Sequence, residues 1–82
     1  MDSQINVEIV EPLLCGRGLV FAARMSGSQR TYVDLNLVVG GRNQNDRQYH
    51  LQGHEPYRFS PKMKGAVRQE AIEAYKRLME SS

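Results

Sequence analysis

The chain has 82 residues, 40% of them hydrophobic, and a formal net charge of +2. A chain this short is expected to form a single domain, residues 1–82, with a thin core. Its one cysteine, Cys15, excludes an internal disulfide and a cysteine-rich zinc site. The sequence has neither an apolar run of about 20 residues, which a membrane span needs, nor a signal-peptide pattern after Met1. We therefore expect a cytoplasmic protein.

The charges are unevenly distributed along the chain. Residues 1–16 contain three acidic residues and no basic one, which gives −3. Residues 17–68 contain nine basic and three acidic residues, which gives +6, whereas residues 69–82 contain two basic and three acidic residues, which gives −1. Eight of the eleven basic residues are arginines, whose planar donor groups suit phosphates and carboxylates. The basic middle indicates either an anionic partner or a solvated face.

Two strands are predicted in the first third of the chain. Apolar and polar residues alternate from Gln4 to Glu11, as in a half-buried strand, and Pro12 is expected to end it. Residues 13–18 are then a connection. A second strand runs from Leu19 to Met25, and Ser26–Gln29 has the composition of a hairpin turn.

The clearest strand pattern runs from Arg30 to Val39. Alternation predicts that one set of side chains, Val33, Leu35, Leu37 and Val39, faces the core and that Tyr32, Asp34, Asn36 and Val38 face the other way. Gly40 and Gly41 end this strand, residues 42–46 form an exposed loop tip, and residues 47–52 form a short fourth strand.

One helix is predicted, from an N-cap at Ser60 to about Met79. Pro61 suits the first helical position, and an apolar stripe contains Met63, Val67, Ala71, Ala74, Tyr75 and Leu78. The predicted fold class is α+β: a four-stranded antiparallel sheet followed by one C-terminal helix packed on one face, in the order β-β-β-β-α.

The sheet face away from the helix mixes polar and apolar residues. We expect Arg24, Tyr32, Val38 and His50 on it, and a face of this composition suits a protein partner or a ligand. Pairing with a second copy would enlarge the thin core, so a homodimer is one expectation.

The predicted helix opens with basic residues, where acidic residues are usually favoured. Arg58, Lys62, Lys64 and Arg68 lie around its N-terminus, and the first acidic residue after Arg58 is Glu70. Together with free backbone N–H groups they form a candidate phosphate or carboxylate site. Arg30, Arg42 and Arg47 flank the predicted loops and complete the set of candidate binding residues. The alternative is that all seven side chains extend into water.

Catalytic and metal-binding motifs are absent from the sequence. His50 and His54 have a spacing that brings two imidazoles together only on a helix, which Gly53 and Pro56 disfavour. Gly16-Arg17-Gly18 lacks the third glycine and the helix of a nucleotide-binding turn. No catalytic residues, metal ligands or cofactors are therefore predicted, and the protein is not expected to be an enzyme.

The helix and the central strand resemble the SpoVG family of small bacterial nucleic-acid-binding regulators. The resemblance rests on Lys64–Val67, Ala71-Ile72 and Tyr75–Leu78, and on Tyr32–Gly40 upstream. After the predicted fourth strand, this chain has Leu51–His54 in place of the proline-serine-basic segment of that family. The resemblance implies a nucleic-acid-binding regulator.

Two functional hypotheses follow. The first is a regulator that contacts nucleic acid or a nucleoprotein through Arg30, Arg42, Arg47, Arg58, Lys62, Lys64 and Arg68. The second is a protein-binding inhibitor or adaptor of the phage or mobile-element type, such as an anti-CRISPR-like protein that acts on a host complex.

Overall fold

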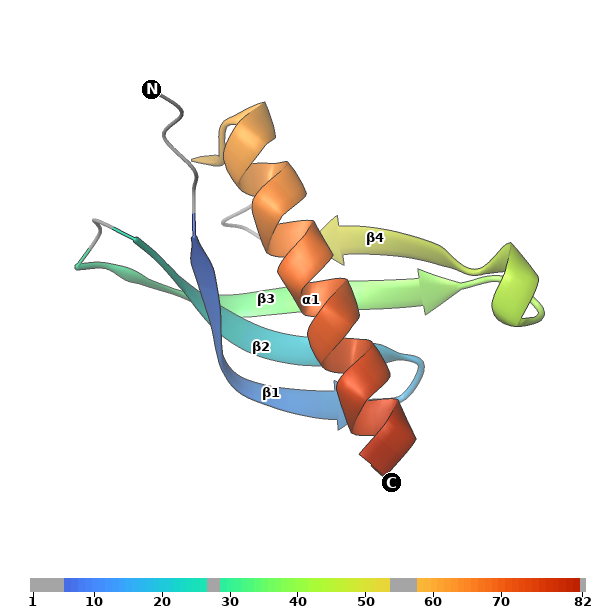
Figure 1. Cartoon of the computed structure of the whole chain (residues 1–82). Helices are drawn as coiled ribbons and strands as arrows, with labels where there is room; N and C mark the ends of the chain where they lie inside the picture. Colours follow the sequence, from blue (N-terminus) through green and yellow to red (C-terminus); the bar gives the residue numbers. More distant parts are fainter. Residues whose placement is uncertain (1–5, 27–28, 54–57, 82) are drawn as a thin grey trace.

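A computed structural model describes residues 6–26, 29–53 and 58–81. Four strands form one antiparallel sheet in the order β1-β2-β3-β4, and a single helix follows them (Figure 1). The strands are β1 (Val7–Cys15), β2 (Gly18–Met25), β3 (Thr31–Gly40) and β4 (Gln48–Gln52), and the helix is α1 (Pro61–Ser81). The predicted α+β fold with the order β-β-β-β-α is confirmed.

The core lies between one face of the sheet and α1. Strands β2 and β3 contribute every second residue to it, and the helix contributes residues spaced three and four apart. Phe59, just before the helix, closes one end of the core and packs edge-on against Tyr32 at 5.0 Å between ring centroids. Among the described residues, the buried hydrophobic ones are Leu19, Phe21, Ala23, Met25, Leu35, Leu37, Val39, Phe59, Val67, Ala71, Ile72, Ala74 and Tyr75.

Strand β1 does not end at Pro12, contrary to the sequence prediction. It continues through the proline to Cys15 because a β-bulge takes up the irregularity: the register shifts between Val10 and Leu13, and Glu11 has φ 49°. Pro12 is tolerated there because β1 is an edge strand of the four described strands. The bulge also turns Leu13 outward, where it is 66% exposed.

A second bulge, in β3, changes which side chains of this strand face the core. Phe21 pairs with Leu35, whereas Ala23 pairs with Tyr32, so β3 has one more residue than β2 over this stretch. Asp34, within the bulge, has φ 58°. The alternation therefore breaks: Tyr32, which was predicted on the outer face, packs against the core, and Val33, which was predicted inside, is 53% exposed.

Both bulges lie beside the same short stretch of β2, around Phe21 and Ala22. Bulges increase the local twist and bend of a strand, and Figure 1 shows β1 turning sharply midway along its length. The bend lets the sheet wrap around α1.

The helix begins as predicted. The backbone N–H of Met63 donates to Ser60 Oγ at 3.3 Å, and the N–H of Lys64 donates to the Ser60 carbonyl at 2.9 Å, so Ser60 is the N-cap. The predicted hairpin turn at 26–29 lies partly outside the described residues. Within the described part of the chain, no helix has the length and hydrophobicity needed to cross a membrane.

Candidate functional site

Two connections meet at one end of the sheet. In an antiparallel meander, the β1–β2 turn and the β3–β4 connection lie at the same end of the strands. Here the N–H of Val39, near the end of β3, donates to the carbonyl of Arg17 in the β1–β2 turn at 3.2 Å. The backbone of Arg17 is therefore fixed beside the start of the β3–β4 connection.

The β3–β4 connection is held by its own hydrogen bonds. Gly41 has φ 103°, and a Cβ at this position would collide with the carbonyl oxygen of Asp46, so the close turn requires glycine. The residues predicted as a plain loop tip include a short 3-10 helix, Gln44–Asp46. Its N-cap is Asn43, whose side-chain oxygen accepts from the N–H groups of Asn45 and Asp46, both at 3.0 Å. Arg42 thus extends from an ordered turn.

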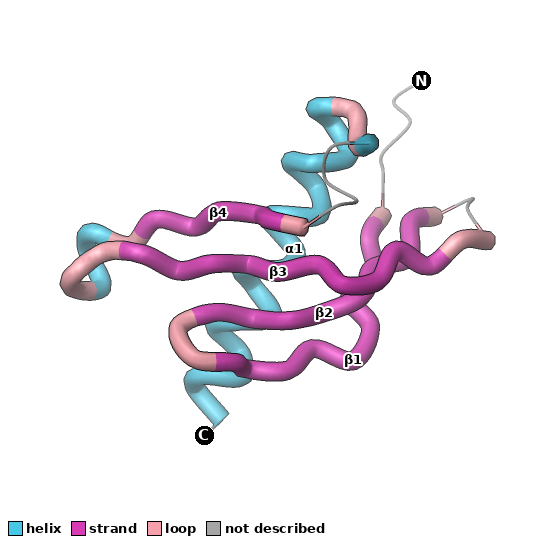
Figure 2. The backbone as a smooth tube through the Cα atoms, turned by 180° about the vertical axis from the view of Figure 1, so that it is seen from behind, coloured by secondary structure: helices cyan, strands magenta, loops and turns pink. Residues whose placement is uncertain are grey.

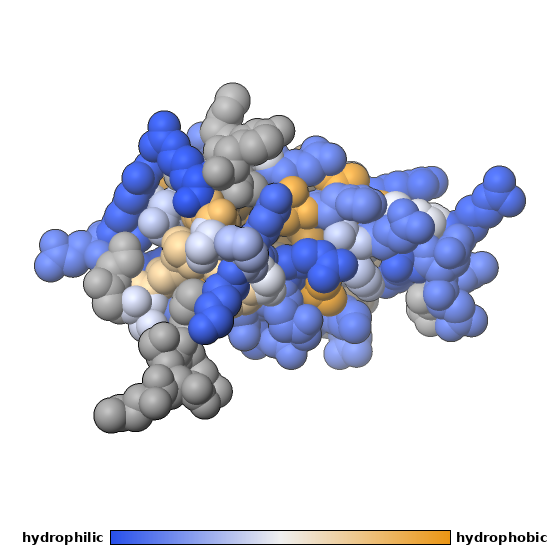
Figure 3. Space-filling model, turned by 90° about the horizontal axis from the view of Figure 1, so that it is seen from above, coloured by the Kyte–Doolittle hydropathy of each residue, from blue (hydrophilic) through white to orange (hydrophobic). Residues whose placement is uncertain are grey.

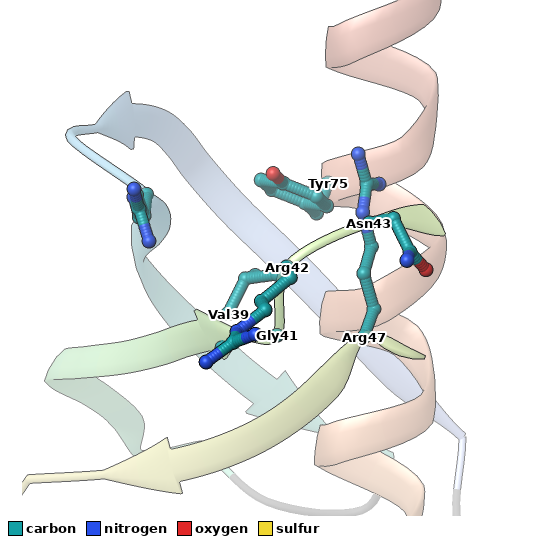
Figure 4. A pocket seen from close by; sticks show the side chains of 8 residues that line it. Val39, Gly41, Arg42, Asn43, Arg47 and Tyr75 are labelled. Carbon is teal, nitrogen blue, oxygen red and sulfur yellow. The ribbon is translucent and has the colours of Figure 1, made fainter. Parts of the chain in front are cut away.

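An open hollow of about 610 Å³ lies between these connections and the helix. Its charged lining consists of Arg17, Arg42 and Arg47, and its described lining residues include no acidic side chain. Figure 4 shows Arg47 extending toward Tyr75 on α1, whereas Arg42 extends from the connection in another direction, past Val39. We call this site the arginine hollow. Three positive charges around one space, without a carboxylate, favour an anionic ligand.

Tyr75 contributes a polar group to the same site. Tyr75 is only 5% exposed, yet its hydroxyl forms no hydrogen bond with any described residue. Buried tyrosine hydroxyls usually have a partner. Because the residue lines the hollow, solvent or a ligand there can supply that partner.

A second basic region continues from the hollow along β4. Lys64, Arg68 and Tyr75 share one side of α1, since separations of four and eleven residues are about one and three helical turns. Lys64 and Arg68 line a shallow groove with Tyr49 and His50 of β4. Arg68 Nε donates to the Tyr49 carbonyl at 3.0 Å, so it occupies a backbone acceptor of this edge strand.

We call the side formed by Arg47, Lys64 and Arg68 the basic edge. Figure 3 looks down from the β4 side of Figure 1 and shows mostly hydrophilic side chains around smaller apolar areas. The acidic residues of the helix lie elsewhere: Glu70 and Glu73 line a different hollow, with Lys76 and Arg77, and Glu80 lies near the C-terminal end of α1. The basic edge is therefore separated from the acids of its own helix.

The seven predicted binding residues do not form one group. Arg42, Arg47, Lys64 and Arg68 lie on the basic edge or in the arginine hollow. Arg30 lies at the other end of β3, whose 10 residues span roughly 30 Å. Its guanidinium stacks on Tyr32 at 5.0 Å from the ring centroid, and Tyr32 contacts Phe59, the neighbour of Arg58.

The predicted site at the helix N-terminus is also divided. Lys62 and Lys64 are both exposed, but they lie about 200° apart around the helix axis. One of the first N–H groups is already bonded to Ser60. Only Lys64 and Arg68 of that predicted set lie together beside β4.

The sheet face opposite α1 is uncovered by any described residue (Figure 2). It carries exposed apolar side chains that include Leu13 at 66% and Val38 at 39%. Of the predicted interface residues, Val38 and His50 pair in register on this outer face, and Arg24 pairs with Glu8. Tyr32 does not belong to the outer face.

The side chains considered for metal binding do not converge. Cys15 pairs with Gly18, Gly18 with Val38, and Val38 with His50. The backbones of Cys15 and His50 are therefore three strand spacings apart, which is roughly 14 Å. His54 lies outside the described residues. Among the described residues, no three His, Cys, Asp or Glu side chains are close enough to hold a metal ion.

Two residues of the site were missed by sequence reasoning. Arg17 was interpreted only as part of a turn, although the topology puts that turn at the same sheet end as Arg42 and Arg47. Tyr75 was assigned to the core, which is correct, but its second role at the hollow has no sequence signal.

Comparison of the chain with protein-family models, with curated proteins and with solved structures gives no match.

Proposed function

We propose that this chain is a non-enzymatic binding protein that contacts the phosphate backbone of nucleic acid through the basic edge and the arginine hollow. The observation that carries the proposal is the adjacency of these two surfaces. Arg47 lines the hollow and lies over the ring of Tyr75, which packs against Tyr49 beside Arg68. Neither the hollow nor the groove beside β4 contains an acidic side chain among its described lining residues. A backbone of regularly spaced phosphates is the anion that such a continuous basic surface suits.

The arrangement also suits backbone contact better than base recognition. The aromatic rings near the basic edge, Tyr49 and Tyr75, pack edge-on against each other at 6.3 Å between centroids. Tyr75 is buried and Tyr49 half-buried, so neither offers an open ring face on which a base can stack. Little sequence preference is expected from such contacts. The resemblance of the helix to the SpoVG family agrees with this proposal.

The salt dependence of binding tests the proposal. Four phosphate contacts, from Arg17, Arg42, Arg47 and Lys64, predict a slope of about −2.8 in log affinity against log salt on single strands. A fluorescently labelled 12-nucleotide strand with hydroxyl ends should then bind about 50-fold more weakly at 200 mM than at 50 mM salt. Absence of binding at 50 mM salt, for DNA and RNA alike, refutes the proposal.

A second candidate function, protein binding, is favoured by the outer face. Leu13 and Val33 are 66% and 53% exposed there, and Glu8 lies in register with the oppositely charged Arg24. We propose a second copy of the chain as the occupant, because a two-fold axis would set Arg24 of each copy against Glu8 of the other. Binding of a different protein, as an inhibitor or adaptor would do, is the alternative outcome.

A further inference from the structure

We propose that the arginine hollow binds the phosphomonoester at the end of a nucleic-acid strand, whereas the basic edge contacts the phosphodiesters that follow. This inference rests on the proposed function and assigns a specific part of the ligand to one part of the surface. Four features of the hollow support it: its charge, its size, its rigidity and its position.

The three positive charges of the hollow outnumber the single negative charge of one internal phosphate. A phosphodiester carries one negative charge, but a terminal phosphomonoester carries about −1.5 to −2 at pH 7 and has three acceptor oxygens. Arg17, Arg42 and Arg47 come from two separate connections and line the same space. None of the three forms an ion pair with a described residue. The forked donors of an arginine can bond two oxygens of one phosphate.

The size and the lining suit a terminal nucleotide. A volume of about 610 Å³ lies within the range of about 300–1,000 Å³ that is usual for small-molecule sites. Val39 and Tyr75 line the hollow but are almost fully buried, so the arginines supply most of the surface that a ligand can contact. The Tyr75 hydroxyl, which has no partner among the described residues, supplies an additional polar group.

The backbone around the hollow is fixed before a ligand arrives. The Val39–Arg17 hydrogen bond holds one connection, and the Asn43 cap with Gly41 holds the other. A preorganised site loses less conformational entropy on binding.

The position of the hollow completes the argument. Arg47 immediately precedes β4, so the hollow lies where the basic edge ends at the β3–β4 connection. A strand lying along the basic edge reaches the hollow with one of its ends, and the remaining nucleotides extend toward Arg68 and Lys64.

Strands of one sequence that differ only at their ends test this inference. Affinity is measured by fluorescence anisotropy for strands with a 5′-phosphate, with a 3′-phosphate and with hydroxyls at both ends. One phosphorylated strand should bind about 10-fold more tightly than the hydroxyl-ended strand. Which end gains affinity gives the direction of the strand along β4.

Variants of Arg17 test whether a preference for the phosphorylated strand arises from the hollow. Arg17→Gln should abolish the preference for the phosphorylated end, so that the phosphorylated and the hydroxyl-ended strands bind this variant with equal affinity. Arg17→Lys, which keeps the charge but loses the fork, should retain part of the preference. Arg77→Gln, which removes an exposed arginine on another side of α1, is the matched control and should retain all of it.

The outcomes separate this inference from the proposed function. Equal affinity for all three strands, or a preference that Arg17→Gln leaves intact, overturns the assignment of the hollow but leaves backbone binding in place. A nucleoside 5′-monophosphate that binds as tightly as the phosphorylated strand would make a free nucleotide the ligand and overturn the strand-end assignment. Failure of every strand to bind at 50 mM salt overturns both proposals.

Discussion

The guanidinium of Arg47 lies over the ring of Tyr75, with its central carbon 5.9 Å from the ring centroid. This cation–π contact joins the residue that precedes β4 to a helix residue 28 positions later, and both residues line the arginine hollow. It therefore links the fold to the candidate site. A contact of this kind contributes about 0.5–1 kcal/mol at a partly exposed position.

The two partners should respond differently to substitution. Arg47→Gln should lower the free energy of unfolding by about 0.5–1 kcal/mol, because the cation–π contact is lost. Tyr75→Phe keeps the ring and removes a hydroxyl that has no described partner, so the free energy of unfolding should change by less than about 0.5 kcal/mol. Urea denaturation measures both values. A loss above about 1 kcal/mol in Tyr75→Phe would show that the hydroxyl has a structural role.

The cap of the β3–β4 connection is expected to stabilise the whole domain. Asn43→Ala removes the side-chain acceptor for two backbone N–H groups and should cost about 1 kcal/mol. Asn45→Ala retains both backbone donors and should change the free energy of unfolding by less than about 0.5 kcal/mol. Equal effects of the two substitutions in chemical denaturation would refute the role of the cap.

At the β1 bulge, substitution by glycine should not destabilise the protein. Glu11 has φ 49°, a conformation that costs a side-chain-bearing residue about 1 kcal/mol. Glu11→Gly should therefore leave stability unchanged or raise it slightly, because relief of this strain offsets the flexibility of glycine. Glu8→Gly, on the same strand in regular pairing, should lower it by about 1 kcal/mol. The reverse order of the two variants in thermal unfolding would contradict the bulge.

The molecular mass in solution tests whether the outer face binds a second copy of the chain. Analytical ultracentrifugation should detect a dimer of the unmodified chain, and Leu13→Asp should convert it to a monomer. Because Leu13 is 66% exposed, this substitution should not unfold a monomer. Ser81→Asp, an exposed position at the end of α1, is the control and should leave the dimer intact. A monomeric unmodified chain would refute the assignment of a second copy.

The sequence was sufficient to predict the element order, the helix boundaries and the N-cap. These features depend on local patterns, such as the alternation in residues 19–25 and the Ser60-Pro61 start. The two bulges were not predictable in this way. A bulge inserts one residue and reverses the alternation beyond it, which is why Tyr32 and Val33 were assigned to the wrong faces. Pro12 was expected to end a strand because proline cannot donate a hydrogen bond to a neighbouring strand, a restriction that an edge strand with a bulge tolerates.

The candidate site was predicted only in part. Arg42, Arg47, Lys64 and Arg68 were recognised from the charge pattern, but their separation from Arg30, Arg58 and Lys62 depends on three-dimensional placement. Strand β3 separates Arg30 from Arg42, and the turn of the helix separates Lys62 from Lys64. Arg17 joins the hollow only because the meander returns its turn to the same sheet end, which charge counting along the chain does not reveal.

The comparison of Lys64→Glu with Lys62→Glu tests the central claim most directly. Both lysines are exposed in the first turns of α1, and both substitutions change the net charge equally, but only Lys64 lies on the basic edge. Binding of a 12-nucleotide strand at 100 mM salt should weaken about 10-fold in Lys64→Glu and by less than about threefold in Lys62→Glu. Equal weakening would mean that net charge alone attracts the strand, and no weakening in Lys64→Glu would mean that nucleic acid does not contact this edge.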